Sequence, residues 1–254
     1  MSTLAIGVDI GGTGIKGALV DVETGELVSS REKIATPRGG RPDDILAATV
    51  ELVSRFGESA DGVPIGVTFP AVVRNGRTMT TANVSDEWVG LKAEELFEKA
   101  LGRDIHFVND ADAAGYAEAR YGAAKGVEGL VILTTLGTGI GSAFLYNGEL
   151  VPNTELGHLE IDGREAEKRA SNAVREKRKL SWKNWAKRLT RFYDHVEFLF
   201  SPELFIVGGG VSKQHEEFLP LIKIDTPLVP ATLRNNAGIL GAAALAAKPH
   251  AARR

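Results

Sequence analysis

The hydrophobic and polar positions along this chain form short apolar runs that alternate with amphipathic segments. Short apolar runs bounded by glycine, proline or aspartate predict β-strands, and they cover Leu4–Val8, Ile15–Val20, Leu27–Ile34, Val63–Phe69, Ile105–Val108, Leu130–Thr135, Ile140–Tyr146 and Leu204–Val207. Apolar residues at helical spacing predict helices, and these cover 45–53, Leu91–Leu101, Ala111–Tyr121, 164–177, 182–200 and Ile239–Ala247. We expect Asp43 or Asp44 to cap the first helix and Ser181 to cap the helix at 182–200. The pattern predicts an α/β protein.

One segment of this pattern occurs twice. The sequence DIGGTGIKGALV begins at Asp9, and the similar TLGTGIGSAFLY begins at Thr135. Each predicts a strand, a Gly-Thr-Gly turn and a second strand, which indicates a duplicated α/β domain with a ligand in a cleft between the halves. We place the domains at residues 1–112 and 113–254, with the option that the C-terminal helix packs back on the first domain.

Glycine-rich turns after strands are suited to phosphate, because the backbone can approach an anion and direct N–H groups at it. Thr13, Thr138 and Lys16 would add hydroxyl donors and a positive charge. The candidate phosphate-binding residues are Gly11, Gly12, Thr13, Lys16, Gly137, Thr138 and Gly139. A third loop, Gly208-Gly209-Gly210, follows another strand and would suit a flat nucleoside. Neither of the first two turns matches a P-loop, because a second strand follows each of them where a P-loop would start a helix.

Asp110 stands where a predicted strand ends and a helix begins, which is the edge where ligands bind in open α/β sheets. Phosphoryl transfer needs a carboxylate to accept the proton of the attacking hydroxyl, and Asp110 is the candidate general base. The alternative is that Asp110 only caps the helix. We expect Mg²⁺ on the phosphates of the donor, with Asp9 holding the ion through water.

Four motifs together resemble the repressor–ORF–kinase (ROK) family of sugar kinases across nearly the whole chain. They are Asp9-Ile10-Gly11-Gly12-Thr13 with Lys16, Asn109-Asp110-Ala111-Asp112, Leu136-Gly137-Thr138-Gly139-Ile140-Gly141, and Glu155-Leu156-Gly157-His158. The resemblance implies actin-like (ribonuclease H-like) duplicated α/β domains with nucleotide and sugar in a central cleft. It also implies Asp110 as the base and a set of sugar-binding residues, namely Asn83, Asn109, Asp110, Glu155, His158 and Glu167.

The chain departs from many family members in having no cysteine. Those members carry a zinc-binding cysteine cluster after the Glu-x-Gly-His motif, where this chain has Asp162-Gly163-Arg164-Glu165-Ala166. We therefore expect no zinc. Glu167 is assigned only by its spacing from Ser171.

A cysteine-free subgroup, the polyphosphate glucokinases and glucomannokinases of actinobacteria, is similar in further segments: Thr68-Phe69-Pro70, Glu118-Ala119-Arg120-Tyr121-Gly122, 196–204 and 233–238. The similarity implies inorganic polyphosphate as donor, with ATP in some members, and a homodimer. Residues 164–191 carry a net charge of +8, which leaves −11 on the rest of the chain. This basic segment, with Lys177, Arg178, Lys179 and Lys183, would dock a linear polyanion; the alternative is a solvated helix face.

Composition excludes several other classes. The chain has 254 residues and no cysteine, which rules out disulfides and thiolate catalysis. It has no long apolar stretch and no signal-peptide pattern, so we expect a cytoplasmic enzyme without membrane contact. The resembled family also contains transcriptional repressors with a DNA-binding domain before the first strand; because that strand starts at Leu4, we expect no such domain. Nucleic acid binding by the basic segment would leave the kinase motifs unexplained. The resemblance to polyphosphate glucokinases implies phosphorylation of the 6-hydroxyl of glucose, leaving mannose open; the alternative is an ATP-only kinase for fructose, mannose or an N-acetylated sugar.

Overall fold

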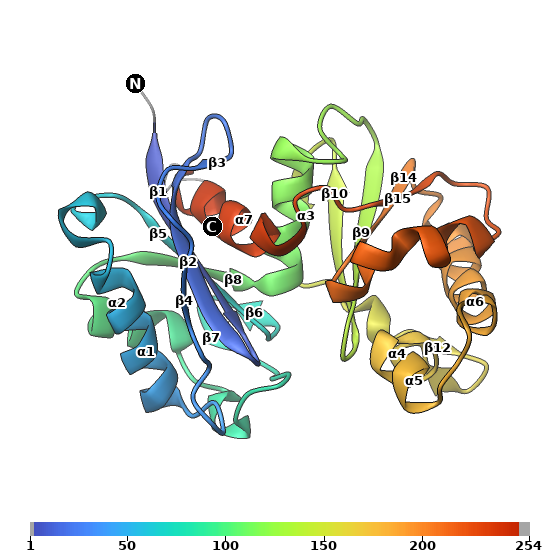
Figure 1. Ribbon diagram of the computed structural model, residues 1–254, viewed down its shortest axis with the longest axis horizontal. Coiled ribbons are helices and arrows are strands. Elements are labelled where there is room, and N and C mark those ends of the chain that lie inside the picture. Colours follow the sequence, from blue (N-terminus) through green and yellow to red (C-terminus); the bar gives the residue numbers. More distant parts are fainter. Residues whose placement is uncertain (1–2, 249–254) are drawn as a thin grey trace. The chain divides into compact units, whose positions relative to one another are not determined.

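The computed structural model describes residues 3–248, which form two compact units (Figure 1). Unit 1 contains the residues up to Ala117 together with those from Asn236 onward, and unit 2 is Glu118–Asn235. The division runs through a helix, between Ala117 and Glu118, and not after residue 112, where the sequence placed the boundary. Among the described residues, no helix has the length and apolar character needed to cross a membrane.

Unit 1 is built on a mixed sheet in the order β3-β2-β1-β5-β8, with β4 also paired to β2. Its strands are Leu4–Gly11 (β1), Gly14–Asp21 (β2), Glu26–Leu27 (β3), Glu32–Ile34 (β4), Ile65–Phe69 (β5) and Ile105–Asn109 (β8). β1 is antiparallel to β2 but parallel to β5, and β5 is parallel to β8. The predicted strand Leu27–Ile34 is wrong as a single element, because the chain leaves the sheet between β3 and β4. A small hairpin, Val73–Arg74 (β6) and Arg77–Thr78 (β7), follows β5.

This sheet is contacted by the helices Pro42–Ser54 (α1), Ala93–Leu101 (α2) and Ala237–Ala246 (α7). Asp110–Tyr121 (α3) follows β8 and lies against α7, where Gly241 approaches Ala113. Arg41 and not an aspartate occupies the N-cap of α1, so the predicted cap is wrong; Pro42 begins the helix instead, which its fixed φ favours. α7 lies directly on β1 and β5 (Figure 1), where Gly7 and Gly66 are required because a Cβ at either would overlap the α7 backbone.

Unit 2 repeats the arrangement with the sheet order β11-β10-β9-β14-β15. Its strands are Leu130–Leu136 (β9), Ile140–Tyr146 (β10), Glu149–Val151 (β11), Leu204–Gly208 (β14) and Leu228–Pro230 (β15). β9 is antiparallel to β10 and parallel to β14, as β1 is to β2 and β5. The duplication predicted from the two Gly-Thr-Gly segments is therefore present in the strand order and directions.

The 19-residue helix Trp182–Phe200 (α6) supplies much of the core of unit 2. Ser181 caps it as predicted, accepting a hydrogen bond from the Asn184 N–H. Its buried face contains Trp185, Leu189 and Tyr193, which follow one another at intervals of four residues. The Tyr193 hydroxyl lies 2.6 Å from Thr134 Oγ1 of β9 and is thus paired inside the core.

The predicted helix over 164–177 is wrong in its first part. Residues Glu160–Ile161 (β12) and Arg164–Glu165 (β13) form a hairpin, and Glu167–Ala170 (α4) and Asn172–Lys177 (α5) are two short helices separated by Ser171. Asp162 and Gly163 join the two strands with φ of +54° and +72°, the backbone geometry of a type I′ hairpin turn. An Asp-Gly pair is a strong hairpin signal, and it outweighs the helical spacing of the residues that follow it.

Candidate active site

The first glycine loop is the turn between β1 and β2. Gly11 pairs with Gly14 across the hairpin, and Gly12 and Thr13 are exposed at its tip. A Cβ on Gly12 would come within 2.7 Å of the Asn83 Cβ, so Asn83 lies directly against this loop. Unit 1 thus brings one predicted sugar-binding residue beside the first predicted phosphate loop.

Asp9, near the end of β1, is held by two neighbours. Its Oδ2 is 3.3 Å from Lys16 Nζ on β2, and its Oδ1 accepts a hydrogen bond from Thr68 Oγ1 at 3.0 Å. The first loop therefore has a lysine and a carboxylate beside it. Lys33, which the sequence analysis did not single out, pairs in register with Lys16 and lies over Gly14. No local sequence signal marks Lys33, because its position depends on the pairing of β4 with β2.

Asn109 and Asp110 stand at the carboxyl end of β8, where α3 begins. Asn109 is 8% exposed and caps the helix: its Oδ1 accepts hydrogen bonds from Ala111 N at 2.8 Å and Asp112 N at 3.0 Å. Its Nδ2 donates to Ala71 O at 2.9 Å, just beyond β5. Asp110 Oδ1 is also 2.8 Å from Ala111 N. The alternative role considered for Asp110, helix capping, is thus mainly carried by Asn109.

The second and third glycine loops lie together in unit 2. Gly137-Thr138-Gly139 joins β9 to β10, and Gly208-Gly209-Gly210 follows β14. Gly209 has a φ of +81°, and a Cβ there would come within 2.7 Å of Leu136 N at the end of β9. Only glycine permits this conformation and this approach without strain. The two loops consequently form one glycine-lined edge at the carboxyl ends of β9 and β14.

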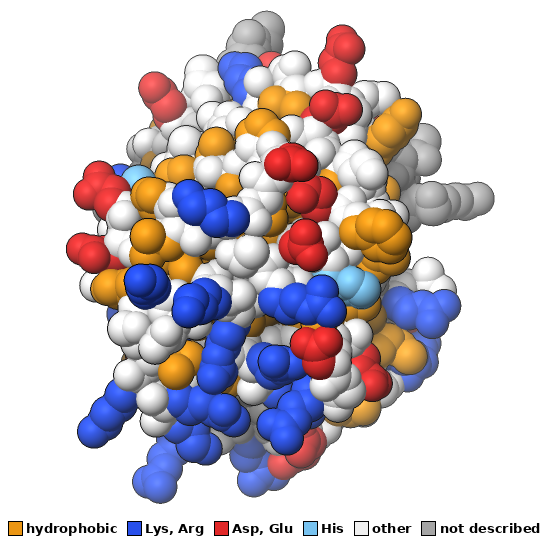
Figure 2. Space-filling view, turned by 90° about the vertical axis from the view of Figure 1, so that its right-hand side faces the viewer, with side chains coloured by type: hydrophobic (Ala, Val, Ile, Leu, Met, Phe, Trp, Pro, Cys, Tyr) orange, Lys and Arg blue, Asp and Glu red, His pale blue; other side chains and the backbone are white. Residues whose placement is uncertain are grey.

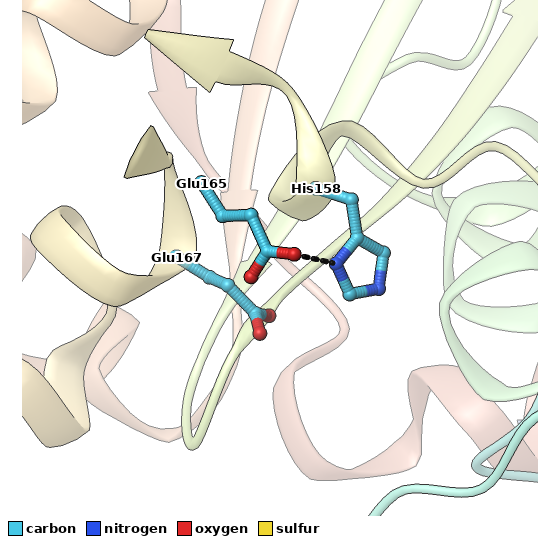
Figure 3. Close-up of side chains that lie close together, drawn as sticks. All are labelled: His158, Glu165 and Glu167. Carbon is cyan, nitrogen blue, oxygen red and sulfur yellow. Dashed lines mark ion pairs between the residues drawn. The ribbon is translucent and has the colours of Figure 1, made fainter. Parts of the chain in front are cut away.

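Three of the predicted sugar-binding residues, Glu155, His158 and Glu167, lie beside that edge. Figure 3 shows two of them, His158 and Glu167, together with Glu165. Glu167 Oε2 accepts a hydrogen bond from the Ile140 N–H at 3.3 Å and lies against Gly139 and Gly157. Glu155 Oε2 is 3.9 Å from His158 Nε2. His158, Glu165 and Glu167 each place a possible ligand atom within 4.8 Å of the others. The cluster joins residues from a 3₁₀ turn at Leu156–His158, from β13 and from α4.

Glu165 belongs to this cluster although the sequence analysis assigned it no role. Its Oε1 lies 3.6 Å from His158 Nδ1, and its Oε2 is paired with Lys168 Nζ. The hydrogen bond from Lys168, assisted by the charges of Lys168 and His158, lowers the pKa of Glu165. The Asp-Gly hairpin signal, which brings β13 back beside the Glu-x-Gly-His segment, could have indicated this position.

Burial raises the pKa of Glu155 above its ordinary value, and the neighbouring carboxylate of Glu167 raises it further, while His158 opposes both effects. Two carboxylates, a third nearby and an imidazole therefore share a small volume. The carboxylate oxygens can accept hydrogen bonds from several hydroxyl groups, and the imidazole N–H can donate one. A polyol, which carries several hydroxyl groups, requires this combination. The same cluster could hold a divalent cation, but the pairing of Glu165 with Lys168 competes with that use.

The predicted docking residues Lys177, Arg178, Lys179 and Lys183 are all exposed, at the end of α5 and the start of α6. Figure 2 shows Lys and Arg side chains gathered over the lower part of the face that it presents, with most acidic side chains elsewhere on that face.

The predicted site residues are distributed over both units. Unit 1 holds the first glycine loop, Asp9, Asn83, Asn109 and Asp110, and unit 2 holds the others.

Comparison with known proteins gives consistent results. The model of the ROK family matches residues 5–172. The chain is 48% identical to the polyphosphate glucokinase of Mycobacterium tuberculosis strain CDC 1551 over 238 residues, which cover 93% of this chain and 89% of that protein.

Solved structures agree. The inorganic polyphosphate/ATP-glucomannokinase of Arthrobacter sp. strain KM is 49% identical with a TM-score of 0.91, covering 99% of this chain and 100% of that one. A ROK family glucokinase from Streptomyces griseus, in complex with glucose and AMPPNP, is 25% identical with a TM-score of 0.80, covering 96% of this chain and 99% of that one. The predicted resemblance and the predicted actin-like α/β fold class are confirmed.

Proposed function

This chain belongs to the ROK family, and we propose that it is a hexose kinase that transfers a phosphoryl group from inorganic polyphosphate or ATP to the 6-hydroxyl of glucose. The observation that carries this proposal is the meeting of Glu155, His158 and Glu167 beside two glycine loops. The 48% identity to a polyphosphate glucokinase supports the choice of substrate and donor.

In this function the sugar binds to the acceptor-rich cluster of unit 2. The carboxylates of Glu155 and Glu167 accept hydrogen bonds from hydroxyl groups, and His158 pairs with a further hydroxyl. Asn83 and Asn109 are proposed to bind further hydroxyl groups through their amides. A site built from such groups selects a polyol, because a ligand that lacks one hydroxyl leaves a buried polar group unpaired.

Asp110 is the general base in the proposed reaction. The attacking hydroxyl loses its proton to the Asp110 carboxylate as its oxygen forms a bond to the phosphorus, and the bond from phosphorus to the rest of the donor breaks. Positioned proton transfer of this kind contributes about a hundred- to ten-thousand-fold to the rate. The cap formed by Asn109 holds the first turn of α3, and with it Asp110, in a fixed conformation.

The donor phosphates bind the backbone N–H groups of residues 11–13 and 137–139, with Thr13, Thr138 and Lys16 as additional donors. Magnesium bound with the donor supplies positive charge to the phosphates, and ions of this kind are held by one or two carboxylates with retained water. Asp9 fits that role as an outer ligand, because both of its oxygens already have protein partners. Gly208, Gly209 and Gly210 would lie against the nucleoside when ATP is the donor.

For polyphosphate, the exposed cations Lys177, Arg178, Lys179 and Lys183 are the proposed docking surface. The alternative function is an ATP-only kinase acting on fructose, mannose or an N-acetylated sugar. The solved glucomannokinase at 49% identity favours both donors, and it supports mannose as a second acceptor.

We also propose a cytoplasmic homodimer with neither a nucleic acid nor a membrane partner, and without structural zinc, since the chain has no cysteine. Phe198, Leu199 and Phe200 lie at the end of α6, and Phe198 is 82% exposed. Exposed apolar groups in succession are typical of protein interfaces. Light scattering would measure the mass, and a monomer at micromolar concentration would contradict the dimer.

The deciding experiment supplies purified protein with glucose or mannose and with ATP or polyphosphate, and detects the sugar 6-phosphate. Asp110→Asn should lower kcat by at least a hundredfold and leave the binding of sugar nearly unchanged. Asp104→Asn, an exposed aspartate six residues earlier, is the matched control. Turnover by Asp110→Asn near that of the control would exclude Asp110 as the base, and phosphorylation of neither sugar with either donor would exclude the function.

A further inference from the structure

A pocket of unit 2 is lined by three arginines from two helices. Arg169 belongs to α4, Arg188 and Arg191 belong to α6, and the apolar lining between them includes Ile161 and Phe192. The pocket is a shallow one that is partly open to solvent. Its lining includes none of Glu155, His158 and Glu167.

The charges in this pocket are not balanced. Asp162 pairs with Arg169 Nη1 at 3.1 Å and with Arg191 Nη2 at 3.2 Å. Arg188 Nη1 instead donates to a backbone carbonyl, Arg169 O, at 2.9 Å. Within residues 3–248, Arg188 forms no ion pair with a carboxylate. Arg191 also pairs with Asp194, at 3.8 Å, so three guanidinium groups face two aspartates.

The electrostatics of Arg188 agree with this imbalance. Burial lowers its pKa, and the nearby positive charges of Arg178 and Arg169 lower it further. An anion placed among these groups would relieve the repulsion. Guanidinium groups bind phosphate oxygens in pairs through their planar N–H groups, and they do so better than lysine does.

A row of cations on α6 ends at the pocket. Lys183, Lys187 and Arg191 follow one another at intervals of four residues, so they lie along one face of the helix about 6 Å apart. Lys183 and Lys187 are exposed, and like charges at this spacing destabilise a helix. A linear polyanion along the row would neutralise them.

We propose that this arginine pocket binds one phosphoryl group of a linear inorganic polyphosphate chain, while the row of Lys183 and Lys187 binds the phosphates next to it. The proposal rests on the proposed use of polyphosphate as donor. The exposed docking residues would then be joined by a defined binding site. In that site, Arg188 donates a charge-assisted hydrogen bond to a phosphate oxygen. A short nucleotide such as ATP cannot occupy both the row and a donor site, so its use should not depend on Arg188.

The test compares Arg188→Gln with the wild type and with Lys125→Gln, which removes an exposed cation outside the pocket. Glutamine keeps a polar amide but is shorter than arginine, so the variant removes the charge together with the hydrogen bond to Arg169 O. Binding of a fluorescent long-chain polyphosphate is measured directly at several salt concentrations, beside the KM for polyphosphate and for ATP with saturating glucose.

We expect Arg188→Gln to weaken polyphosphate binding about ten- to hundredfold, the loss typical of a hydrogen bond to a charged group. The slope of log affinity against log salt should fall by about one, and the KM for ATP should stay within twofold. Arg188→Lys should keep the salt slope of the wild type and recover part of the affinity. Lys125→Gln should match the wild type in affinity.

Several results would overturn the proposal that this pocket binds polyphosphate. Equal polyphosphate affinity and equal salt slope in Arg188→Gln and Lys125→Gln would do so, as would equal losses toward ATP and polyphosphate. Single-stranded DNA of equal charge, binding as tightly and with the same dependence on Arg188, would replace polyphosphate as the ligand. If the wild type binds polyphosphate through Arg188 yet phosphorylates glucose only with ATP, the donor assignment fails while the pocket stands.

Discussion

Replacement of Asn109 by alanine separates the structural role of this residue from its proposed contact with sugar. The variant removes the Oδ1 acceptor of Ala111 N and Asp112 N and the Nδ2 donor to Ala71 O. Loss of a helix N-cap costs about 0.5–2 kcal/mol, and leaving the buried Ala71 carbonyl without its donor costs about 1–3 kcal/mol. We therefore expect about 2–4 kcal/mol of lost stability. For a chain of this size, this loss lowers Tm by roughly 5–15 °C.

Thermal and urea unfolding of three variants give the measurement. Asn109→Ser keeps a capping hydroxyl but is too short to reach Ala71 O, so it should lose about half as much stability as Asn109→Ala. Asn83→Gly is the matched control, because Asn83 is exposed and its φ of +64° suits glycine. Both asparagines are proposed to bind sugar, so both variants should raise the KM for glucose, while only the Asn109 variants should lower Tm. A Tm for Asn109→Ala within 2 °C of the wild type would refute the capping argument.

Further predictions concern the sugar site and the donor. Glu155→Gln and His158→Ala should each raise the KM for glucose about five- to hundredfold, since each leaves a polar partner unpaired; unchanged KM values would make this segment structural. Because the pKa of Glu155 is raised by burial and by Glu167, its carboxylate takes up a proton at a higher pH than an ordinary glutamate, and the KM for glucose should begin to rise there as pH falls. In Glu167→Gln the rise should move to lower pH; superimposable pH profiles would contradict this coupling. Steady-state kinetics at two salt concentrations should show a higher KM for polyphosphate, but not for ATP, when glutamine replaces four cations together: Lys177, Arg178, Lys179 and Lys183.

The sequence predicted the sheets well because their signals are local. The apolar runs of β1, β2, β9 and β10 are bounded by glycine turns, and the two halves repeat one another. The register Gly11 to Gly14 follows from the short turn between the strands. The predicted helix over 164–177 failed because two local signals compete in that segment. At 164–177 the charged residues have helical spacing, yet Asp162 and Gly163 adopt the positive φ of a hairpin turn and bring Arg164 and Glu165 into a strand.

Contacts between distant segments were beyond local patterns. Nothing near Lys33 indicates that β4 pairs with β2 and places it opposite Lys16. Likewise, the capping role of Asn109 depends on Ala71, which lies 38 residues away and reaches it only because β5 and β8 are neighbours. The residue types at the candidate site could be read from motifs, whereas their hydrogen-bond partners required the topology.

Asp162 links the geometry of the sugar cluster to the charge of the arginine pocket. Its positive φ closes the β12–β13 hairpin, which places Glu165 beside His158, and its carboxylate holds Arg169 of α4 and Arg191 of α6. The two ion pairs lower the pKa of Asp162, so they persist at neutral pH and weaken only as the medium becomes acidic enough to protonate it. The turn at Asp162 therefore contributes to two sites. It positions Glu165 in the carboxylate cluster proposed to bind hydroxyl groups, and it holds Arg169 and Arg191 of the pocket proposed to bind phosphate. In this chain without cysteine, the ion pairs of Asp162 connect the hairpin to α4 and α6.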